Sequence, residues 1–452
     1  MSPARAQPPS ILHLYAELLL HIRTVTLFAS LRTEHTAQTK AELSADGESI
    51  TLTHEGERAA IRLPTQIAGG GSAVLTLPEA PSKDLTLRLQ LQEKSPGLLK
   101  GAGGARGENV APWDAASLAG CARVACRECG AELVDTKGGS DAAGAEDESA
   151  GVRSWMDLPN ENWAEMMDFW HCHKPHEHHL PGHTHDVGRE KGYAASNRIT
   201  AKKGVGYVDL AYLLLDEADC PGVQLSTPTS VDSTQAEGQP TDRQSLTCSN
   251  CKTAVGVLDL RAEGWRIWKW SIAATPKGST SAQTYSIRKW ISAQLLYLIE
   301  NQGVRKFTVM SDSAPADNDE SESGTATSDP ITIWIFTPDL AFSSSIASDR
   351  RNDPTRAMKV LWKPAPAPLP VRQQPANGGD AAGGAVQPVG GKTQSQALDR
   401  QSLSVEELSL PAPAFRALRG ALRESGEWLP ASARTFQEWS VGLLERFGDD
   451  EV

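Results

Sequence analysis

The chain has 452 residues, a formal net charge of −12 and a hydrophobic fraction of 39%. At roughly 150 residues per domain, this length is sufficient for two or three hydrophobic cores. The acidic balance argues against a nucleic-acid-binding surface, because phosphate contacts require clustered Lys and Arg. The composition therefore favours globular domains whose partners are proteins and not RNA or DNA.

We expect neither a secretory signal nor a membrane span in this chain. Its N-terminal apolar run, residues 11–20, is interrupted by His13, Tyr15 and Glu17 and lacks a small-residue cleavage site. No stretch approaches the roughly 18 uninterrupted apolar residues of a membrane helix. Four of the seven cysteines form two Cys-x-x-Cys pairs, a spacing typical of metal binding in a chain without a secretion signal. We therefore expect a cytoplasmic and nuclear protein without a membrane partner.

The first part of the chain is predicted to be rich in β-strands. Alternating apolar and polar side chains indicate strands at residues 22–27, 49–53, 60–63 and 84–91. A small antiparallel sheet or sandwich is the simplest arrangement of these strands. We assign them to an N-terminal β-rich domain that covers residues 1–110.

Four segments with few apolar residues are interpreted as insertions between folded parts of the chain. They are rich in Gly, Ser, Ala, Asp, Pro and Gln and cover residues 136–151, 226–245, 311–328 and 364–401. We expect them to be disordered loops and not domains.

The later segments predict further strands and three helices. Apolar patterns indicate strands at residues 256–260, 265–272, 331–336 and 358–362. Helical periodicity places Trp290, Ile291 and Leu295 on one apolar stripe, and it predicts helices at residues 282–300, 413–425 and 435–447. The predicted fold class is therefore α+β and strand-dominated, with an α+β C-terminal region over residues 261–452.

Two Cys-x-x-Cys hooks indicate a structural zinc site in the middle region, residues 111–260. Cys126 and Cys129 form one hook, and Cys248 and Cys251 form the other. Zinc takes four such ligands in a tetrahedron, so one pair cannot close a structural site but two pairs can. The long intervening segment is no obstacle, because closure entropy grows only with the logarithm of loop length. A redox-active pair is the alternative, against which the absence of a βαβ pattern argues.

An amphipathic helix is predicted at residues 158–170, followed by a His-rich loop. Trp163 and Trp170 lie on one apolar face, which in the simplest interpretation packs against a sheet. Seven of the eleven histidines lie within the fifteen residues that begin at the helix tip, which fits either a second zinc site or a solvated metal-binding loop. Cys172 lies at the C-terminal end of the helix, where the helix dipole raises a thiol pKa. This position favours a metal ligand over a nucleophile.

With these residues identified, the chain resembles the HECT-like, E2-binding ubiquitin-protein ligase family and looks like a fungal-type member. The resemblance covers most of the chain outside the four insertions. The matching motifs are Cys121 with Cys126-x-x-Cys129-Gly130, Leu158-Pro-x-Glu-Asn-Trp163, Trp170-x-Cys172-His173, and Cys248-x-x-Cys251 with Gly256 nearby. The Leu-Pro-x-Glu-Asn-Trp and Trp-x-Cys-His motifs are specific, whereas the cysteine hooks alone are not.

The resemblance implies a ubiquitin-protein ligase that binds a ubiquitin-conjugating enzyme (E2) and ubiquitin. It also implies binding to the endonuclease of pre-mRNA 3′-end cleavage and polyadenylation, whose zinc Cys172 is expected to ligate. Trp163, Trp170 and His173 would then belong to the same partner-binding surface. The alternative function is a non-enzymatic chaperone or inhibitor of that metallo-nuclease, without intrinsic ligase chemistry.

The chain departs from HECT ligases at the catalytic cysteine. HECT ligases pass ubiquitin through a thioester on a cysteine near the C-terminus, whereas this chain has no cysteine after Cys251. The catalytic candidates that remain are Cys121 and Cys172. Cys121 could equally be a core residue or a substitute metal ligand, and Cys220 is expected to be incidental. Scaffolding of a charged E2 requires no nucleophile from the ligase and is the alternative to covalent transfer.

Overall fold

The structure is a computed structural model that describes residues 12–19, 22–67, 73–91, 111–136, 151–158, 199–226, 244–312, 329–349, 351–365 and 405–451. Most residues of the four predicted insertions lie outside these ranges, as does the predicted tryptophan helix apart from Leu158. The fold is α+β and dominated by strands, as predicted. Within the described part of the chain, no helix is long and apolar enough to cross a membrane.

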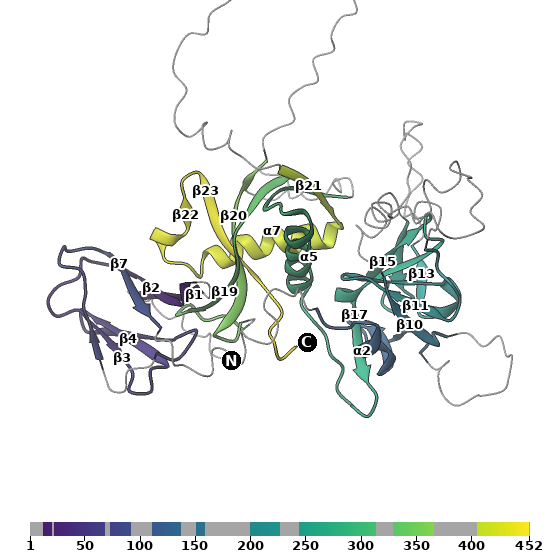
Figure 1. Cartoon of the computed structure of the whole chain (residues 1–452), viewed down its shortest axis with the longest axis horizontal. Coiled ribbons are helices and arrows are strands. Elements are labelled where there is room, and N and C mark those ends of the chain that lie inside the picture. Colours follow the sequence, from purple (N-terminus) through teal and green to yellow (C-terminus); the bar gives the residue numbers. More distant parts are fainter. Residues whose placement is uncertain are drawn as a thin grey trace, which may run out of the picture. The chain divides into compact units, whose positions relative to one another are not determined.

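The chain divides into two compact units. Unit 1 comprises residues 1–106 and 298–446, and unit 2 comprises residues 107–297 and 447–452. This division differs from the three consecutive domains predicted from the sequence at 1–110, 111–260 and 261–452. The physical reason is strand pairing between distant segments, because strand β1 near the N-terminus pairs with β19 of the C-terminal region (Figure 1).

Unit 1 is built around a nine-stranded sheet. Its order is β22, β23, β20, β19, β1, β2 and β7, with β18 paired to β19 and β21 paired to β18. The strand bounds are β1 (Leu12–Leu19), β2 (Thr24–Leu31), β7 (Asp84–Gln90), β18 (Lys306–Ser311), β19 (Ile331–Ser344), β20 (Thr355–Pro364), β21 (Val405–Leu410), β22 (Thr435–Phe436) and β23 (Trp439–Glu445).

A second, four-stranded sheet in unit 1 has the order β5, β4, β3, β6. Its strands are β3 (Lys40–Leu43), β4 (Ser49–His54), β5 (Glu57–Arg62) and β6 (Ala73–Leu75). In β4 alternate side chains are buried, as the alternating sequence pattern predicts. Ile50 and Leu52 of β4 share one apolar cluster with Leu14 of β1 and Leu27 of β2. The two sheets therefore share one apolar cluster, and the nine-stranded sheet continues into the C-terminal region.

Helix α7 (Ala412–Gly426) confirms the helix predicted at residues 413–425 and packs against β23 and β18. Its buried face includes Phe415, Leu418 and Leu422, which follow the helical repeat. Gly442 in β23 allows a close approach, because an added Cβ there would lie 2.8 Å from the Leu422 carbonyl oxygen.

The second C-terminal helix, predicted at residues 435–447, is wrong. The segment forms the β22–β23 hairpin, in which Phe436 pairs with Trp439. Gln437, in the connecting turn, has a φ of +53° that no helix accommodates. The apolar residues of the segment fit a period of two as well as the helical one, and pairing of β23 with β20 decides in favour of the strand.

Unit 2 contains a seven-stranded sheet and a three-stranded sheet. Their orders are β10, β11, β12, β16, β15, β14, β13 and β17, β8, β9. The strands are β8 (Cys121–Cys126), β9 (Glu132–Val134), β10 (Ser154–Asp157), β11 (Val205–Val208), β12 (Tyr212–Leu215), β13 (Val223–Leu225), β14 (Ser245–Cys248), β15 (Ala254–Asp259), β16 (Gly264–Trp268) and β17 (Ile272–Pro276).

The described part of unit 2 also contains three short helices. They are α2 (Ala115–Ala119), η3 (Glu217–Asp219) and η4 (Lys269–Ser271). The strand predicted at residues 265–272 is divided by η4, so the chain leaves the larger sheet at β16 and enters the smaller one at β17. Helix α5 (Ile287–Gln302) agrees with the predicted helix, and the boundary between the two units falls within it.

Candidate metal centre

The first hook lies at the turn between β8 and β9. Cys126 is the last residue of β8, and its N–H donates to the Ala131 carbonyl at 2.7 Å. The N–H of Gly130 donates to the Cys126 carbonyl at 2.8 Å. Gly130 has a φ of +71°, a left-handed conformation that glycine adopts without steric penalty. This turn places the sulfurs of Cys126 and Cys129 on the same side of the hairpin tip.

The second hook, between β14 and β15, repeats the same hydrogen-bond pattern. Cys248 ends β14, and its N–H donates to the Thr253 carbonyl at 2.9 Å. Lys252 occupies the position equivalent to Gly130, with a φ of +63° and its N–H 2.9 Å from the Cys248 carbonyl. Its Nζ donates to the Ser249 carbonyl at 2.7 Å, a contact that fixes the turn without a glycine.

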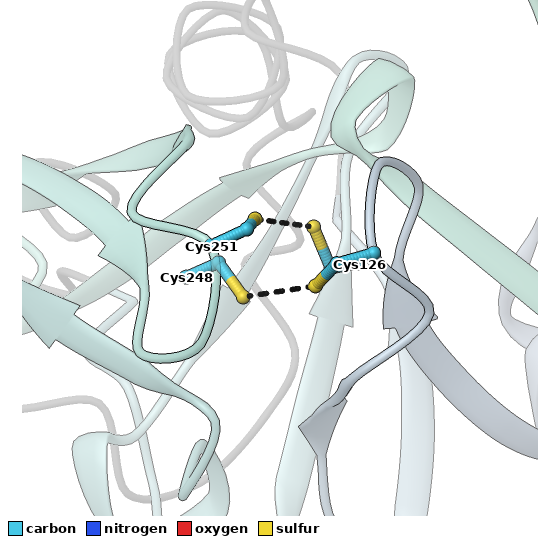
Figure 2. Close-up of side chains that lie close together, drawn as sticks. Cys126, Cys248 and Cys251 are labelled. Atoms are coloured by element: carbon cyan, nitrogen blue, oxygen red, sulfur yellow. Dashed lines mark hydrogen bonds between the residues drawn. The ribbon is translucent and has the colours of Figure 1, made fainter.

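The two hooks face each other and bring four sulfurs together, as Figure 2 shows. The Sγ atoms of Cys126 and Cys251 are 3.7 Å apart, as are those of Cys129 and Cys248. All four sulfurs lie within 4.8 Å of one another. A tetrahedral site with Zn–S bonds of about 2.3 Å requires neighbouring sulfurs about 3.8 Å apart. The arrangement therefore fits a single metal ion held by four thiolates.

The four thiols differ in the direction in which their pKa values shift. The pKa is raised for the buried Cys126 and Cys248 and lowered for the less buried Cys129 and Cys251. Burial raises the pKa of Cys126 to about 12 and also raises the pKa of Cys248. A hydrogen bond from the Asn250 side chain, followed by one from the Ala131 N–H, lowers the pKa of Cys129 to about 6. Hydrogen bonds with the side chain and N–H of Thr253 lower the pKa of Cys251. Ionisation of the buried thiols Cys126 and Cys248 therefore requires a nearby cation, which a metal ion held by the four sulfurs would supply.

Gly222 joins the two hooks. Its N–H donates to the Leu133 carbonyl of β9 at 3.3 Å, and its carbonyl accepts from the N–H of Ser249 in the second hook at 2.9 Å. A Cβ at position 222 would lie 1.8 Å from the Glu132 carbonyl oxygen. Any side chain there would push the hairpins apart. No motif or spacing in the sequence points to this glycine.

The other described cysteines lie away from the metal centre. Cys121 is at the opposite end of β8 from Cys126, where it is 5% exposed and its Sγ is 3.5 Å from the Ser117 carbonyl. Burial raises the pKa of the Cys121 thiol, and burial followed by the charge of Asp219 raises that of Cys220 well above its ordinary value. Neither environment activates a thiol as a nucleophile.

The partner-binding residues predicted from the sequence, Trp163, Trp170, Cys172 and His173, lie outside the described residues. Only the start of their motif is described. Leu158 directly follows β10, and its N–H donates to the Val208 carbonyl at 2.7 Å. The motif therefore begins at the edge of the seven-stranded sheet.

Comparisons with known proteins include a family match that covers both cysteine hooks and the motif that begins at Leu158. The sequence model described as HECT-like ubiquitin-conjugating enzyme (E2)-binding matches residues 17–441. An uncharacterized protein of Saccharomyces cerevisiae is 20% identical over 63% of this chain and 61% of that protein. An uncharacterized protein of Schizosaccharomyces pombe is 22% identical over 66% of this chain and 69% of that protein.

The chain thus spans about three fifths of the budding-yeast relative, at 61% of its length. No solved structure matches the fold. The family match runs through both units and across both cysteine hooks. The chain belongs to the HECT-like, ubiquitin-conjugating enzyme (E2)-binding family.

Proposed function

We propose that this protein is an E2-binding ubiquitin-protein ligase in which one structural Zn²⁺ joins the two sheets of unit 2. The family match over residues 17–441 carries the proposal, because it covers nearly the whole chain. The zinc assignment is supported by the sulfur spacing at the four-cysteine site and by the preference of Zn²⁺ for tetrahedral thiolates. In this proposal the metal serves the architecture and takes no part in ubiquitin transfer.

The described thiols favour a scaffold mechanism. In such a mechanism the substrate amine attacks the thioester carbonyl of the E2–ubiquitin conjugate, the E2 thiolate leaves, and an isopeptide bond forms. The ligase then contributes binding and orientation but no covalent bond. Cys121 and Cys220 are both buried with raised thiol pKa values, so neither is suited to accept ubiquitin from an E2.

Reconstitution with ubiquitin-activating enzyme, a panel of E2s and ubiquitin tests this proposal. We expect ubiquitin chains above the background of reactions without the protein, and we expect Cys121→Ser to retain that activity. A reducible ubiquitin adduct on the wild-type chain that disappears in Cys121→Ser or Cys172→Ser would replace the scaffold with a thioester mechanism. No activity with any E2 would remove the ligase assignment.

We also propose that the protein binds and restrains the pre-mRNA 3′-end processing endonuclease through the tip that carries Cys172. The supporting observations are the Trp170-x-Cys172-His173 motif and the attachment of its segment to the sheet edge through Leu158. A thiolate from the tip would ligate the zinc of the nuclease, because coordination to a metal deprotonates a thiol. This role would place the protein in the nucleus as well as the cytoplasm.

A pull-down with the purified nuclease tests this second role. Cys172→Ala should weaken the complex at least about tenfold while the zinc content of the free protein stays unchanged. Cys220→Ala is the matched control, because Cys220 is a thiol outside both the four-cysteine site and the tip. Equal affinity of wild type and Cys172→Ala would remove Cys172 from the interface and leave ligase activity as the sole proposed function.

A further inference from the structure

The last described residues form a short tail that leaves one unit and joins the other. Strand β23 ends at Glu445 in unit 1, whereas the residues from Phe447 onward belong to unit 2. Residues 449–450 of this tail are exposed, but Phe447 is only 5% exposed. The tail therefore packs against the rest of unit 2 at particular residues, while residues 449–450 stay exposed.

The first anchor of the tail is the ring of Phe447. It lies edge-on to Trp290, with ring centroids 4.9 Å apart and an interplanar angle of 73°. Tyr285 approaches it at 5.5 Å and 80°, in the same T-shaped manner. Trp113 completes the aromatic cluster at 4.9 Å from the ring of Tyr285. Edge-to-face pairs of this kind favour an aromatic ring over an aliphatic side chain of similar size.

The second anchor is Glu451. Lys289 Nζ lies 2.6 Å and 2.5 Å from its two carboxylate oxygens, and the Tyr285 hydroxyl donates to its main-chain carbonyl at 3.0 Å. Burial and the nearby charge of Glu451 raise the pKa of Tyr285, which keeps the hydroxyl protonated as a donor. Lys269 adds positive charge to the cluster, with its Nζ 5.3 Å from the centre of the Trp290 ring.

The two anchors are held by contacts within the tail. The N–H of Gly448 donates to the Glu451 carboxylate at 2.8 Å, and the N–H of Glu451 donates to the Gly448 carbonyl at 3.1 Å. Both anchors are therefore contained in a turn of five residues, Phe447 to Glu451. A short peptide of the same sequence contains every one of these contacts.

We propose that Trp113, Tyr285, Lys289 and Trp290, here called the tail seat, form a docking site for acidic peptides. The peptide that fits has a phenylalanine four residues before a glutamate, and the chain's own tail occupies the seat in cis. A tethered ligand has an effective concentration in the millimolar range, so the tail acts as a built-in competitor. A peptide segment of a partner displaces the tail from the seat when its local concentration is comparable to the effective concentration of the tail. This inference goes beyond the proposed ligase function and does not depend on it.

Peptide exchange on the full-length chain tests the proposal. The probe is a fluorescent peptide with the sequence of residues 447–452, followed by anisotropy. A full-length variant with Phe447→Ala and Glu451→Lys, which vacates the seat, should bind this probe at least about tenfold more tightly than wild type. A probe that binds neither the variant nor wild type would overturn the proposal.

Charge reversal identifies the seat. Lys289→Glu in the vacated variant should abolish binding of the native probe and restore binding of a probe with Glu451→Lys. Lys277→Glu is the matched control, because Lys277 is an exposed lysine of unit 2 that donates to the Ala119 carbonyl and not to the tail. Equal losses in the two lysine variants would show non-specific attraction and contradict the proposal.

A second measurement covers the case in which the vacated variant fails to fold. Wild-type protein is mixed with excess isotope-labelled peptide, and hydrogen exchange is followed at the chain's own residues 447–451. Displacement from the seat should speed their exchange several-fold, since their protection comes from the contacts that the peptide replaces. Unchanged exchange at saturating peptide would show that the tail is a permanent part of the fold and would overturn the proposal.

Discussion

Units 1 and 2 each hold two β-sheets together, but unit 2 adds a four-cysteine site to its buried side chains and main-chain hydrogen bonds. In unit 1 the two sheets share an apolar cluster of many buried side chains, including Leu14, Leu27 and Ile50. In unit 2 the tip of the three-stranded sheet meets the tip of the β14–β15 hairpin at four cysteine sulfurs. The comparison teaches that apolar burial is distributed over a surface, whereas the four-cysteine site of unit 2 is a single local connection.

A hydrophobic core and a single metal site respond differently to the loss of one side chain. Loss of one apolar side chain removes one part of a large sum. Loss of one metal ligand removes the entire site, because a structural site needs all four ligands. The predictions below test this difference, in order of decreasing expected effect.

The largest effect is expected for Cys248→Ser. A structural zinc contributes about 10–16 kcal/mol in small zinc-dependent domains, so its loss should unfold the two hooks and loosen the sheets of unit 2. Protection of β14 and β8 should fall by orders of magnitude, whereas β1 and β2 in unit 1 should keep theirs. Cys220→Ser, another buried thiol of unit 2, is the control with retained zinc. An equal loss of hydrogen-exchange protection in both units would contradict the claim that the metal site acts within unit 2.

The reciprocal perturbation is Phe415→Ala in helix α7. Phe415 is 1% exposed, and truncation of a buried phenylalanine destabilises a core by about 3–5 kcal/mol. Denaturant midpoints should shift for unit 1, while bound zinc stays at the wild-type amount. Zinc loss in this variant would show that the metal centre depends on unit 1.

Buried charge in unit 2 predicts a pH dependence. Burial lowers the pKa of Lys269 to about 8 from its ordinary value of 10.5, although Asp209, Asp157 and Asp114 partly oppose this shift. Between these two pH values the unfolded state binds more protons than the folded state, so the unfolding free energy rises with pH. Below pH 8 the burial penalty is complete, and above 10.5 it is absent.

Lys269→Met removes this titration. The side chain of Lys269 is almost completely buried, so the variant should be more stable than wild type by about 1–3 kcal/mol at pH 7. Its stability should also lack the rise between about pH 8 and about pH 10.5. Denaturation of both proteins at a series of pH values measures the difference. Identical slopes for the two proteins would remove Lys269 as the cause.

The smallest effect compares the two hooks. Gly130→Ala places a Cβ on a residue with a φ of +71°, which should destabilise the first hook by about 1 kcal/mol. An added Cβ there meets no atom within 4 Å, so the penalty arises from the backbone alone. Lys252→Gly at the equivalent position relieves the φ of +63° but loses the Nζ contact with the Ser249 carbonyl, so its net effect should be close to zero. Competition with a zinc chelator measures the zinc affinity of both variants. A larger loss of affinity in Lys252→Gly than in Gly130→Ala would contradict this prediction.

The local features of the fold could be predicted from the sequence. The spacing of Cys126 and Cys129 fixes a hook because a tight turn aims both sulfurs at one ion, and the alternation at residues 84–91 fixes strand β7. Both inferences depend on neighbours along the chain.

The features that could not be predicted depend on contacts between distant residues. The pairing of β1 with β19 joins segments more than 300 residues apart in the sequence, and no periodicity encodes it. The segment at residues 435–447 fits two periods, and only its partner β20 selects the strand. Gly222 matters because of the carbonyl of Glu132, to which no sequence motif connects it.

X-ray absorption at the zinc edge of the purified full-length protein tests the central claim most directly. The account predicts one zinc per chain with four sulfur neighbours at about 2.3 Å. It also predicts that this shell is lost in Cys248→Ser. A shell dominated by nitrogen or oxygen, or a protein that folds without any bound metal, would contradict it.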